Sequence, residues 1–123
     1  GKEATTRWTF DGIGRSISTP SVAGGLVFIN EYDGDLHCLD ADTGKQYWVH
    51  ETLSRVWSSC LVADGKVFLT TEDGEMHILG AGKDKKVLGT VEFGSSIYAS
   101  PVVANGVLYV GTMTHLYAIG TGK

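Results

Sequence analysis

The first candidate for metal chemistry is an acidic segment in the first half of the sequence. Asp40 and Asp42 lie two residues apart, and Gly44 follows them at the same spacing. Calcium loops of the EF-hand type need oxygen ligands at alternate positions, then a glycine, and finally a closing glutamate. Gly44 occupies the position of the third oxygen ligand. We therefore interpret the segment as a turn capped by its own aspartate side chains, and we expect no metal there.

The histidines and cysteines also lack the spacing of a known catalytic or metal-binding motif. His37 and His77 are 40 residues apart in equivalent positions of a repeat, and Tyr117 holds the third such position. A position that accepts both His and Tyr favours packing over metal binding. Cys38 and Cys60 are too few for a disulfide framework or a four-cysteine zinc site.

Charge and hydropathy exclude two classes of partner. The 123 residues carry a formal net charge of −4, so no broad cationic field is available to attract nucleic acid or an anionic membrane surface. No apolar run approaches the roughly 18 residues that a membrane-spanning helix requires. We therefore expect neither nucleic acid nor a membrane span.

The sequence contains an internal repeat, which predicts the strands that position these residues. Three copies align over the segments 18–29, 58–69 and 99–110. Each copy contains Gly-Gly, Asp-Gly or Asn-Gly, which are dipeptides of two-residue β-hairpins, and each is interpreted as a series of short strands. Four-stranded units with a period near 40 residues are typical of β-propeller blades, whereas helical repeats need amphipathic helices. The sequence therefore predicts an all-β propeller with three blades per chain.

The repeat also predicts domain boundaries. We expect a single partial propeller domain over residues 1–123, which is either half of a six-bladed ring or a fragment of a larger propeller. Residues 1–15 supply a fourth strand that completes a neighbouring or partner blade. Blades 1 and 2 span 16–55 and 56–95, and residues 96–123 form a third blade without its fourth strand.

One segment resembles the tryptophan-docking motif of quinoprotein (PQQ-like) propellers. That motif has a small residue, an aspartate two positions later, Thr-Gly, and a tryptophan four residues after the glycine. The corresponding residues here are Cys38, Asp40, Thr43, Gly44 and Trp48. The second copy departs from the motif, with Leu88 in place of the tryptophan. The resemblance implies that Trp48 and its equivalent Trp8 pack between blades, each with its indole N–H bonded to a neighbouring turn.

The quinoprotein family contains both enzymes and binding proteins. Its quinone-dependent alcohol dehydrogenases typically carry adjacent cysteines, whereas Cys38 and Cys60 are 22 positions apart. The other branch is similar to the lipoprotein of the outer-membrane β-barrel assembly machinery. The resemblance implies a non-catalytic scaffold or protein-binding module without a cofactor, in the periplasm or another extracytoplasmic compartment. Two alternatives are a fragment of a PQQ-dependent dehydrogenase and a piece of a larger propeller with no activity of its own.

Loops that follow a fourth strand supply the candidate binding residues. Arg15 and Arg55 are equivalent by repeat, and Trp57 and Tyr98 occupy a second equivalent position. Arginine and aromatic residues are enriched at binding hot spots, so we expect these four to bind an acidic or extended peptide at the mouth of the channel. The alternative is that the arginines pair with acids at the hairpin tips, namely Glu31, Glu72 or Asp73.

Three blades cannot close a ring, because propellers typically have four to eight. We predict a head-to-tail homodimer with six blades, which leaves no open end. In this dimer Trp8 and Phe10 of one copy lie beside Leu116 and Tyr117 of the other. The alternative is that the remaining blades of a longer parent chain cover the same apolar faces.

Overall fold

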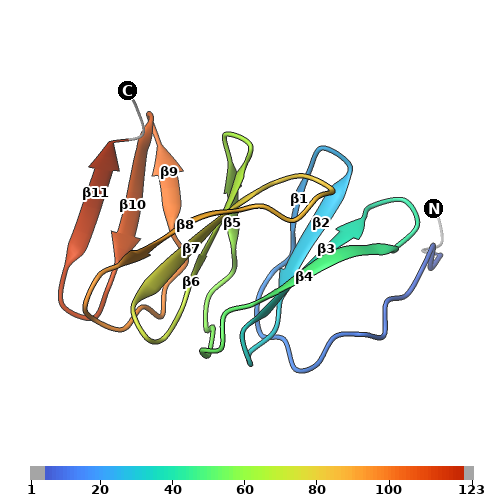
Figure 1. Cartoon of the computed structure of the whole chain (residues 1–123), viewed down its shortest axis with the longest axis horizontal. Helices are drawn as coiled ribbons and strands as arrows, with labels where there is room; N and C mark the ends of the chain where they lie inside the picture. The colour runs from blue at the N-terminus through green and yellow to red at the C-terminus, as the bar shows by residue number, and fades with distance from the viewer. Residues whose placement is uncertain (1–4, 121–123) are drawn as a thin grey trace.

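The computed structural model describes residues 5–120 as three antiparallel sheets arranged like a fan (Figure 1). Blade 1 consists of β1 (Ser21–Ala23), β2 (Leu26–Asn30), β3 (Asp35–Asp40) and β4 (Gln46–Glu51). Blade 2 consists of β5 (Leu61–Ala63), β6 (Lys66–Thr70), β7 (Glu75–Gly80) and β8 (Val87–Glu92). Blade 3 consists of β9 (Val102–Ala104), β10 (Val107–Gly111) and β11 (Leu116–Gly120). The predicted all-β fold with three propeller blades is confirmed.

The first turn of every blade has the geometry that its dipeptide predicts. Both central residues of these turns have positive φ, between 53° and 79°. That geometry matches the right-handed twist of the flanking strands, and it requires residues that tolerate φ above zero. The residues concerned are Gly24–Gly25, Asp64–Gly65 and Asn105–Gly106.

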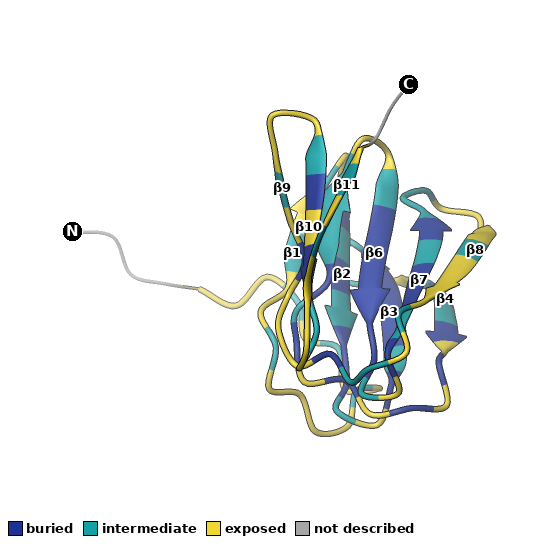
Figure 2. Ribbon diagram, turned by 90° about the vertical axis from the view of Figure 1, so that its left-hand side faces the viewer, coloured by how far each residue is buried: buried dark blue, intermediate teal, exposed yellow. Residues whose placement is uncertain are grey.

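The core consists of two apolar layers, each between neighbouring blades. In the layer between blades 1 and 2, Phe28 and Leu36 meet Val67 and Leu69 of β6. The intervening residue of β6, Phe68, points to the other layer, between blades 2 and 3. Consecutive residues of β6 are therefore buried against different blades, which explains the continuous apolar run Val67–Leu69. Figure 2 shows that most of β6 is buried.

Hydroxyl groups connect the innermost strands of adjacent blades. The backbone N–H of Thr19 donates to Ser59 Oγ at 2.8 Å. The backbone N–H of Ser59 in turn donates to Ser100 Oγ at 2.9 Å. Because these three residues are equivalent by repeat, the same bond joins each blade to the next.

The N-terminal segment lies outside the three sheets. Residues 1–15 were expected to supply a fourth strand to a neighbouring or partner blade, and residues 5–15 are not in a strand, since no described strand pairs with them. Their side chains nevertheless pack on blade 1, where the Phe10 ring meets His37 edge to face at 5.6 Å. The pairing of this segment with a neighbouring blade stays a prediction.

One face of blade 3 is uncovered. Tyr109 and Leu116 are 36% and 73% exposed, whereas their repeat equivalents in blade 2, Phe68 and Met76, are buried against blade 3. The repeat therefore places apolar residues on the face of blade 3 that would meet another blade.

Candidate functional site

The predicted binding residues lie together at the ends of the blades. Arg15 and Arg55 have their guanidinium carbons 4.9 and 5.4 Å from the centroid of the Tyr32 ring. Trp57 meets Tyr32 edge to face at 5.0 Å and lies 5.8 Å from the Tyr98 ring. We call these five residues the cation–aromatic row.

Equivalent backbone bonds position the two arginines. The N–H of Tyr32, in the turn between β2 and β3, donates to the carbonyl of Arg15 at 2.7 Å. The N–H of Glu72, in the turn between β6 and β7, donates to the carbonyl of Arg55 at 2.8 Å. Each arginine is thus held against the hairpin tip that follows it in the sequence, and both guanidinium groups lie over the Tyr32 ring.

The row is exposed and retains positive charge. Trp57 and Tyr98 are 38% and 44% exposed. Within residues 5–120, neither Arg15 nor Arg55 forms an ion pair, so the alternative of pairing with hairpin-tip acids is not observed. Glu72 instead accepts a hydrogen bond from Trp57 Nε1 at 2.7 Å. Exposed guanidinium groups on aromatic faces can bind carboxylates and aromatic side chains.

Sequence reasoning missed Tyr32, which connects the row. Its repeat equivalents are Glu72 and Met113, so its ring is not a feature of the repeat. The only sequence signal is that all three equivalents are large side chains at hairpin tips. Their contact with loops from another repeat depends on how adjacent blades pack.

The tryptophans assigned by resemblance to blade packing occupy two different settings, with Trp48 at the contact between blades 1 and 2 and Trp8 on a turn of blade 1. Trp48 is 7% exposed, and its Nε1 donates to the carbonyl of Gly82 at 2.9 Å. Trp8 Nε1 donates to the carbonyl of Ala41 at 2.9 Å. The Trp8 indole covers Gly44 so closely that a Cβ on Gly44 would overlap it. Gly44 also has a φ of 78°.

Asp40 caps its own turn, as interpreted from the sequence. Its Oδ2 accepts a hydrogen bond from the Tyr47 hydroxyl at 2.7 Å. Its Oδ1 accepts the backbone N–H groups of Asp42 and Thr43 at 2.8 and 2.9 Å. These bonds, the Tyr47 bond first, lower the pKa of Asp40 to about 2. The carboxylate therefore stays ionised and holds the turn.

The contact between blades 2 and 3 lacks the docked tryptophan. Leu88 occupies the position equivalent to Trp48 and is 52% exposed. It borders an apolar cavity of about 680 Å³ that Phe68 and Leu108 also line. Among residues 5–120, this blade contact is therefore less completely filled than the contact between blades 1 and 2.

Both cysteines are buried free thiols in the layer between blades 1 and 2. Burial raises the pKa of Cys38 to about 11, and it also raises the pKa of Cys60. Neither thiol has the lowered pKa of a reactive cysteine.

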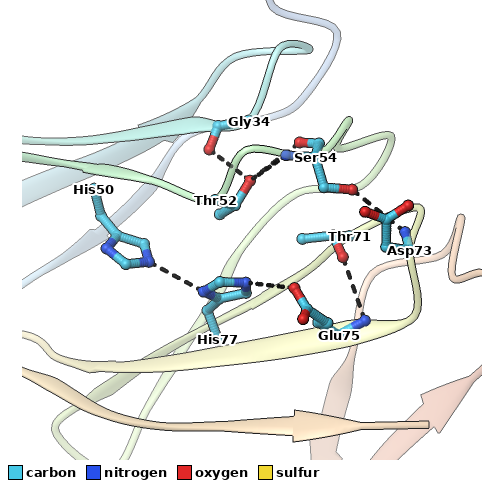
Figure 3. A network of polar contacts seen from close by, with 8 residues as sticks. All are labelled: Gly34, His50, Thr52, Ser54, Thr71, Asp73, Glu75 and His77. Carbon is cyan, nitrogen blue, oxygen red and sulfur yellow. Dashed lines mark hydrogen bonds and ion pairs between the residues drawn. The ribbon is translucent and has the colours of Figure 1, made fainter. Parts of the chain in front are cut away.

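Buried histidines form a polar chain across the contact between blades 1 and 2 (Figure 3). His50 Nε2 lies 3.1 Å from His77 Nδ1, and His77 Nε2 lies 3.2 Å from Glu75 Oε1. His50 Nδ1 is buried without a hydrogen-bond partner among the described residues. Burial, followed by the charges of His77 and Lys85, lowers the pKa of His50 to about 4.

The His50 environment predicts a loss of stability in mild acid. With a folded-state pKa near 4 and an unfolded-state pKa of about 6.5, only the unfolded chain takes up this proton between those values. The free energy of unfolding therefore falls as the pH is lowered through this window. His50→Phe, which copies the equivalent Phe10, should make urea denaturation less dependent on pH between about 4 and 6.5. If the variant keeps the pH dependence of the wild-type chain, titratable groups other than His50 cause the loss of stability in acid.

Comparison with known proteins places this geometry in a family. The family model described as outer membrane protein assembly factor BamB matches residues 2–82, about two thirds of the chain. A search of the curated proteins finds no match. No helix within residues 5–120 has the length and hydropathy to cross a membrane.

Solved propellers share the fold. BamB from Moraxella catarrhalis superposes with a TM-score of 0.79 at 21% identity, over 94% of this chain and 36% of that one. The quinohemoprotein alcohol dehydrogenase ADHIIG from Pseudomonas putida HK5 has a TM-score of 0.73 at 22% identity, over 95% of this chain and 21% of that one. The quinohemoprotein alcohol dehydrogenase from Comamonas testosteroni has a TM-score of 0.73 at 17% identity, over 93% of this chain and 20% of that one.

This chain therefore spans about a third of the length of the BamB structure and a fifth of the dehydrogenases. The three structures share the PQQ-like propeller fold, whereas the family-model match rests on sequence. With three blades of that fold and a family model that covers most of its length, the chain belongs to the PQQ-like propeller family described as outer membrane protein assembly factor BamB.

Proposed function

We propose that this chain is part of a non-catalytic propeller that binds an extended, acidic segment of a partner protein through the cation–aromatic row. The observation that carries the proposal is the pair of arginines that both meet the Tyr32 ring. They are free of ion pairs within residues 5–120, and the same ring meets the exposed Trp57. Carboxylates of the partner would meet the guanidinium groups, and its apolar side chains would meet the aromatic rings.

The family description supports a biological setting for this binding. Because the matching model is described as an outer membrane protein assembly factor, we propose an extracytoplasmic role in assembling outer membrane proteins, with the propeller as scaffold. The partner would then be another component of the assembly apparatus or one of its clients.

The experiment compares peptide binding by paired variants. A fluorescein-labelled extended peptide of alternating glutamate and aromatic residues is titrated with the chain, and fluorescence anisotropy reports binding. Arg15→Ala with Arg55→Ala should weaken binding at least about tenfold, because both guanidinium groups would lose their charge-assisted hydrogen bonds to the carboxylates of the peptide. The melting temperature should change by only a few degrees, since exposed substitutions usually cost under about 0.5 kcal/mol each.

The chain provides a control with the same change of charge. Lys45 and Lys83 also carry cations over one tyrosine ring, at 5.9 and 5.5 Å from the Tyr47 centroid. They lie in turns at the other ends of the strands from the row. Lys45→Ala with Lys83→Ala should leave peptide binding unchanged. An equal loss in both double variants would show that only net charge matters, and would contradict the proposed site.

The dehydrogenase alternative has a separate test. It is favoured by the fold shared with the two quinohemoprotein dehydrogenases. Titrating the chain with pyrroloquinoline quinone and calcium, and following quinone absorbance, should show no saturable complex if the propeller is non-catalytic. A stoichiometric complex would favour the enzyme fragment.

We also propose that the uncovered face of blade 3 packs against a further blade of the same type. In the head-to-tail dimer, that blade is built around Trp8 and Phe10 of a second copy, and Leu116 and Tyr117 lie beside them. Support comes from the exposed Leu116, whose equivalent Met76 is buried against the next blade. A dimeric mass in sedimentation at micromolar concentration is expected, and a folded monomer would contradict the dimer.

A further inference from the structure

Three metal-ligating side chains converge near the turn between β2 and β3. Glu31 follows β2, and Asp35 and His37 lie on β3, so the hairpin brings them to the same place. One potential ligand atom from each lies within 4.8 Å of the other two. Glu31 and His37 are only 8% and 4% exposed. Burying carboxylates beside a histidine lowers the stability of the fold unless the negative charges are compensated.

Both ring nitrogens of His37 face oxygen atoms. Nδ1 lies 2.6 Å from Gln46 Oε1, and Nε2 lies 2.5 Å from Glu31 Oε2. A neutral imidazole has one N–H group, so it can donate to only one of these oxygens. With Nδ1–H donating to Gln46, the Nε2 lone pair faces the Glu31 carboxylate. A cation bound by Nε2 and the Glu31 carboxylate would satisfy both groups in this tautomer.

The surroundings carry excess negative charge. Asp35 lies opposite Glu51 in the pairing of β3 with β4, and its carboxylate also lies within 4.8 Å of a Glu31 oxygen. Within residues 5–120, no lysine or arginine forms an ion pair with any of these carboxylates. A cation that entered this site would relieve the repulsion between the carboxylates.

Blade 2 offers an internal comparison. His77 is equivalent to His37, but Thr71 replaces Glu31 and Lys86 replaces Gln46. His77 bonds to Glu75 on one side and to His50 on the other, so its two nitrogens do not both face carboxyl or amide oxygens. The acidic environment in blade 1 is therefore not a requirement of the fold.

We propose that Glu31, Asp35 and His37 bind a divalent transition-metal cation of the zinc class. One imidazole nitrogen and two carboxylate oxygens are ligands that zinc accepts, and a water molecule would complete four-coordination. The bond from Nδ1 to Gln46 is the outer contact that typically orients a metal-bound histidine. Tetrahedral zinc separates its ligand atoms by roughly 3.3 Å, so Glu31 and His37 move apart slightly to admit the ion.

The N-terminal segment covers this site. The Phe10 ring packs on His37, and a Cβ on Gly14 would lie only 2.6 Å from Glu31 Oε1. The bound cation therefore fixes the β2–β3 turn together with the segment that precedes blade 1. Its expected role is to hold that segment against the blade.

The experiment uses the full chain and two metal probes. Cobalt(II) added to the metal-free chain should give the intense visible absorption of a four-coordinate ion, saturating at one ion per chain, and zinc should displace it. Zinc should also raise the melting temperature, because it binds the folded state. If cobalt gives no such absorption or zinc gives no shift, the proposal is wrong.

Substitutions that introduce the residue found at the equivalent position of another blade should weaken metal binding without unfolding the chain. Glu31→Thr copies Thr71, and His37→Tyr copies Tyr117, so the fold already accommodates both residues. Each should weaken zinc binding at least a hundredfold. Gln46→Lys, which copies Lys86, should weaken it about 10–100-fold, because it removes only the orienting contact. Glu31→Thr directly tests whether the Glu31 carboxylate is a ligand.

The matched control makes the same change in blade 2. His77→Tyr should leave zinc affinity and the cobalt spectrum unchanged. Equal binding by the wild-type chain, Glu31→Thr and His37→Tyr would assign the metal to an adventitious surface histidine and overturn the site. If a variant fails to fold by circular dichroism, Gln46→Lys still decides the outcome, since undiminished affinity in that variant contradicts the proposed geometry.

Discussion

Replacing Trp48 by alanine should lower the free energy of unfolding by about 3–5 kcal/mol, the range for truncating a large buried aromatic residue. The indole is 7% exposed and packs 6.0 Å from the Phe28 ring. Its Nε1 also satisfies the carbonyl of Gly82 in the next blade. The substitution therefore leaves a cavity and breaks a hydrogen bond at the same blade contact. Urea denaturation followed by circular dichroism measures the loss.

Trp57→Ala is the matched control, because Trp57 is 38% exposed and belongs to the cation–aromatic row. We expect it to cost clearly less than Trp48→Ala. A loss below about 1 kcal/mol for Trp48→Ala would show that its indole contributes little packing. In that case Trp48 would be available to a ligand.

Gly34→Ala should lower the free energy of unfolding by a similar amount, about 3 kcal/mol or more, because the backbone at Gly34 cannot accommodate a side chain. Gly34 has a φ of 108°, where side chains are strained. Its missing Cβ would overlap the backbone carbonyl of Ser54 and lie 2.5 Å from Thr52 Oγ1. Thr52 Oγ1 also donates to the Gly34 carbonyl at 3.0 Å (Figure 3). The loop and the turn would have to separate to admit a methyl group.

Gly24→Ala separates the two contributions to this loss. Gly24 has a φ of 58°, but no atom lies within 4 Å of the position its Cβ would take. This variant should cost only the conformational penalty, about 1–2 kcal/mol. Similar losses in chemical denaturation for the two variants would mean that the close approach to Ser54 has no energetic consequence.

The sequence predicts most of the fold because the fold is local and repeated. The turn dipeptides fix the hairpins, and Asp40 and Trp48 occur at the spacing of a known docking motif. The strand expected from the N-terminal segment stays a prediction. A strand needs a neighbour to supply its hydrogen bonds, and within residues 5–120 no strand pairs with this segment.

The candidate sites are less predictable because they depend on contacts between different repeats. The alignment placed Arg15 and Arg55 in equivalent positions, but it could not show that both guanidinium groups meet the same Tyr32 ring. His37 was interpreted as a packing residue because Tyr117 shares its position. Its polar partners Glu31 and Gln46 are replaced in blade 2 by Thr71 and Lys86, so comparing the repeats does not predict their contacts with His37.

The two contacts between blades should differ in stability, because Leu88 takes the place of the docked tryptophan at the contact between blades 2 and 3. In repeat proteins, stability is approximately a sum of unit terms and nearest-neighbour contact terms. The contact of blade 3 with blade 2 surrounds a cavity of about 680 Å³ where the preceding contact has an indole. Partial unfolding should therefore begin at blade 3, whose amide protons would exchange with solvent before those of β2 and β3. The chain opens from one side, while blades 1 and 2 persist as the last folded unit.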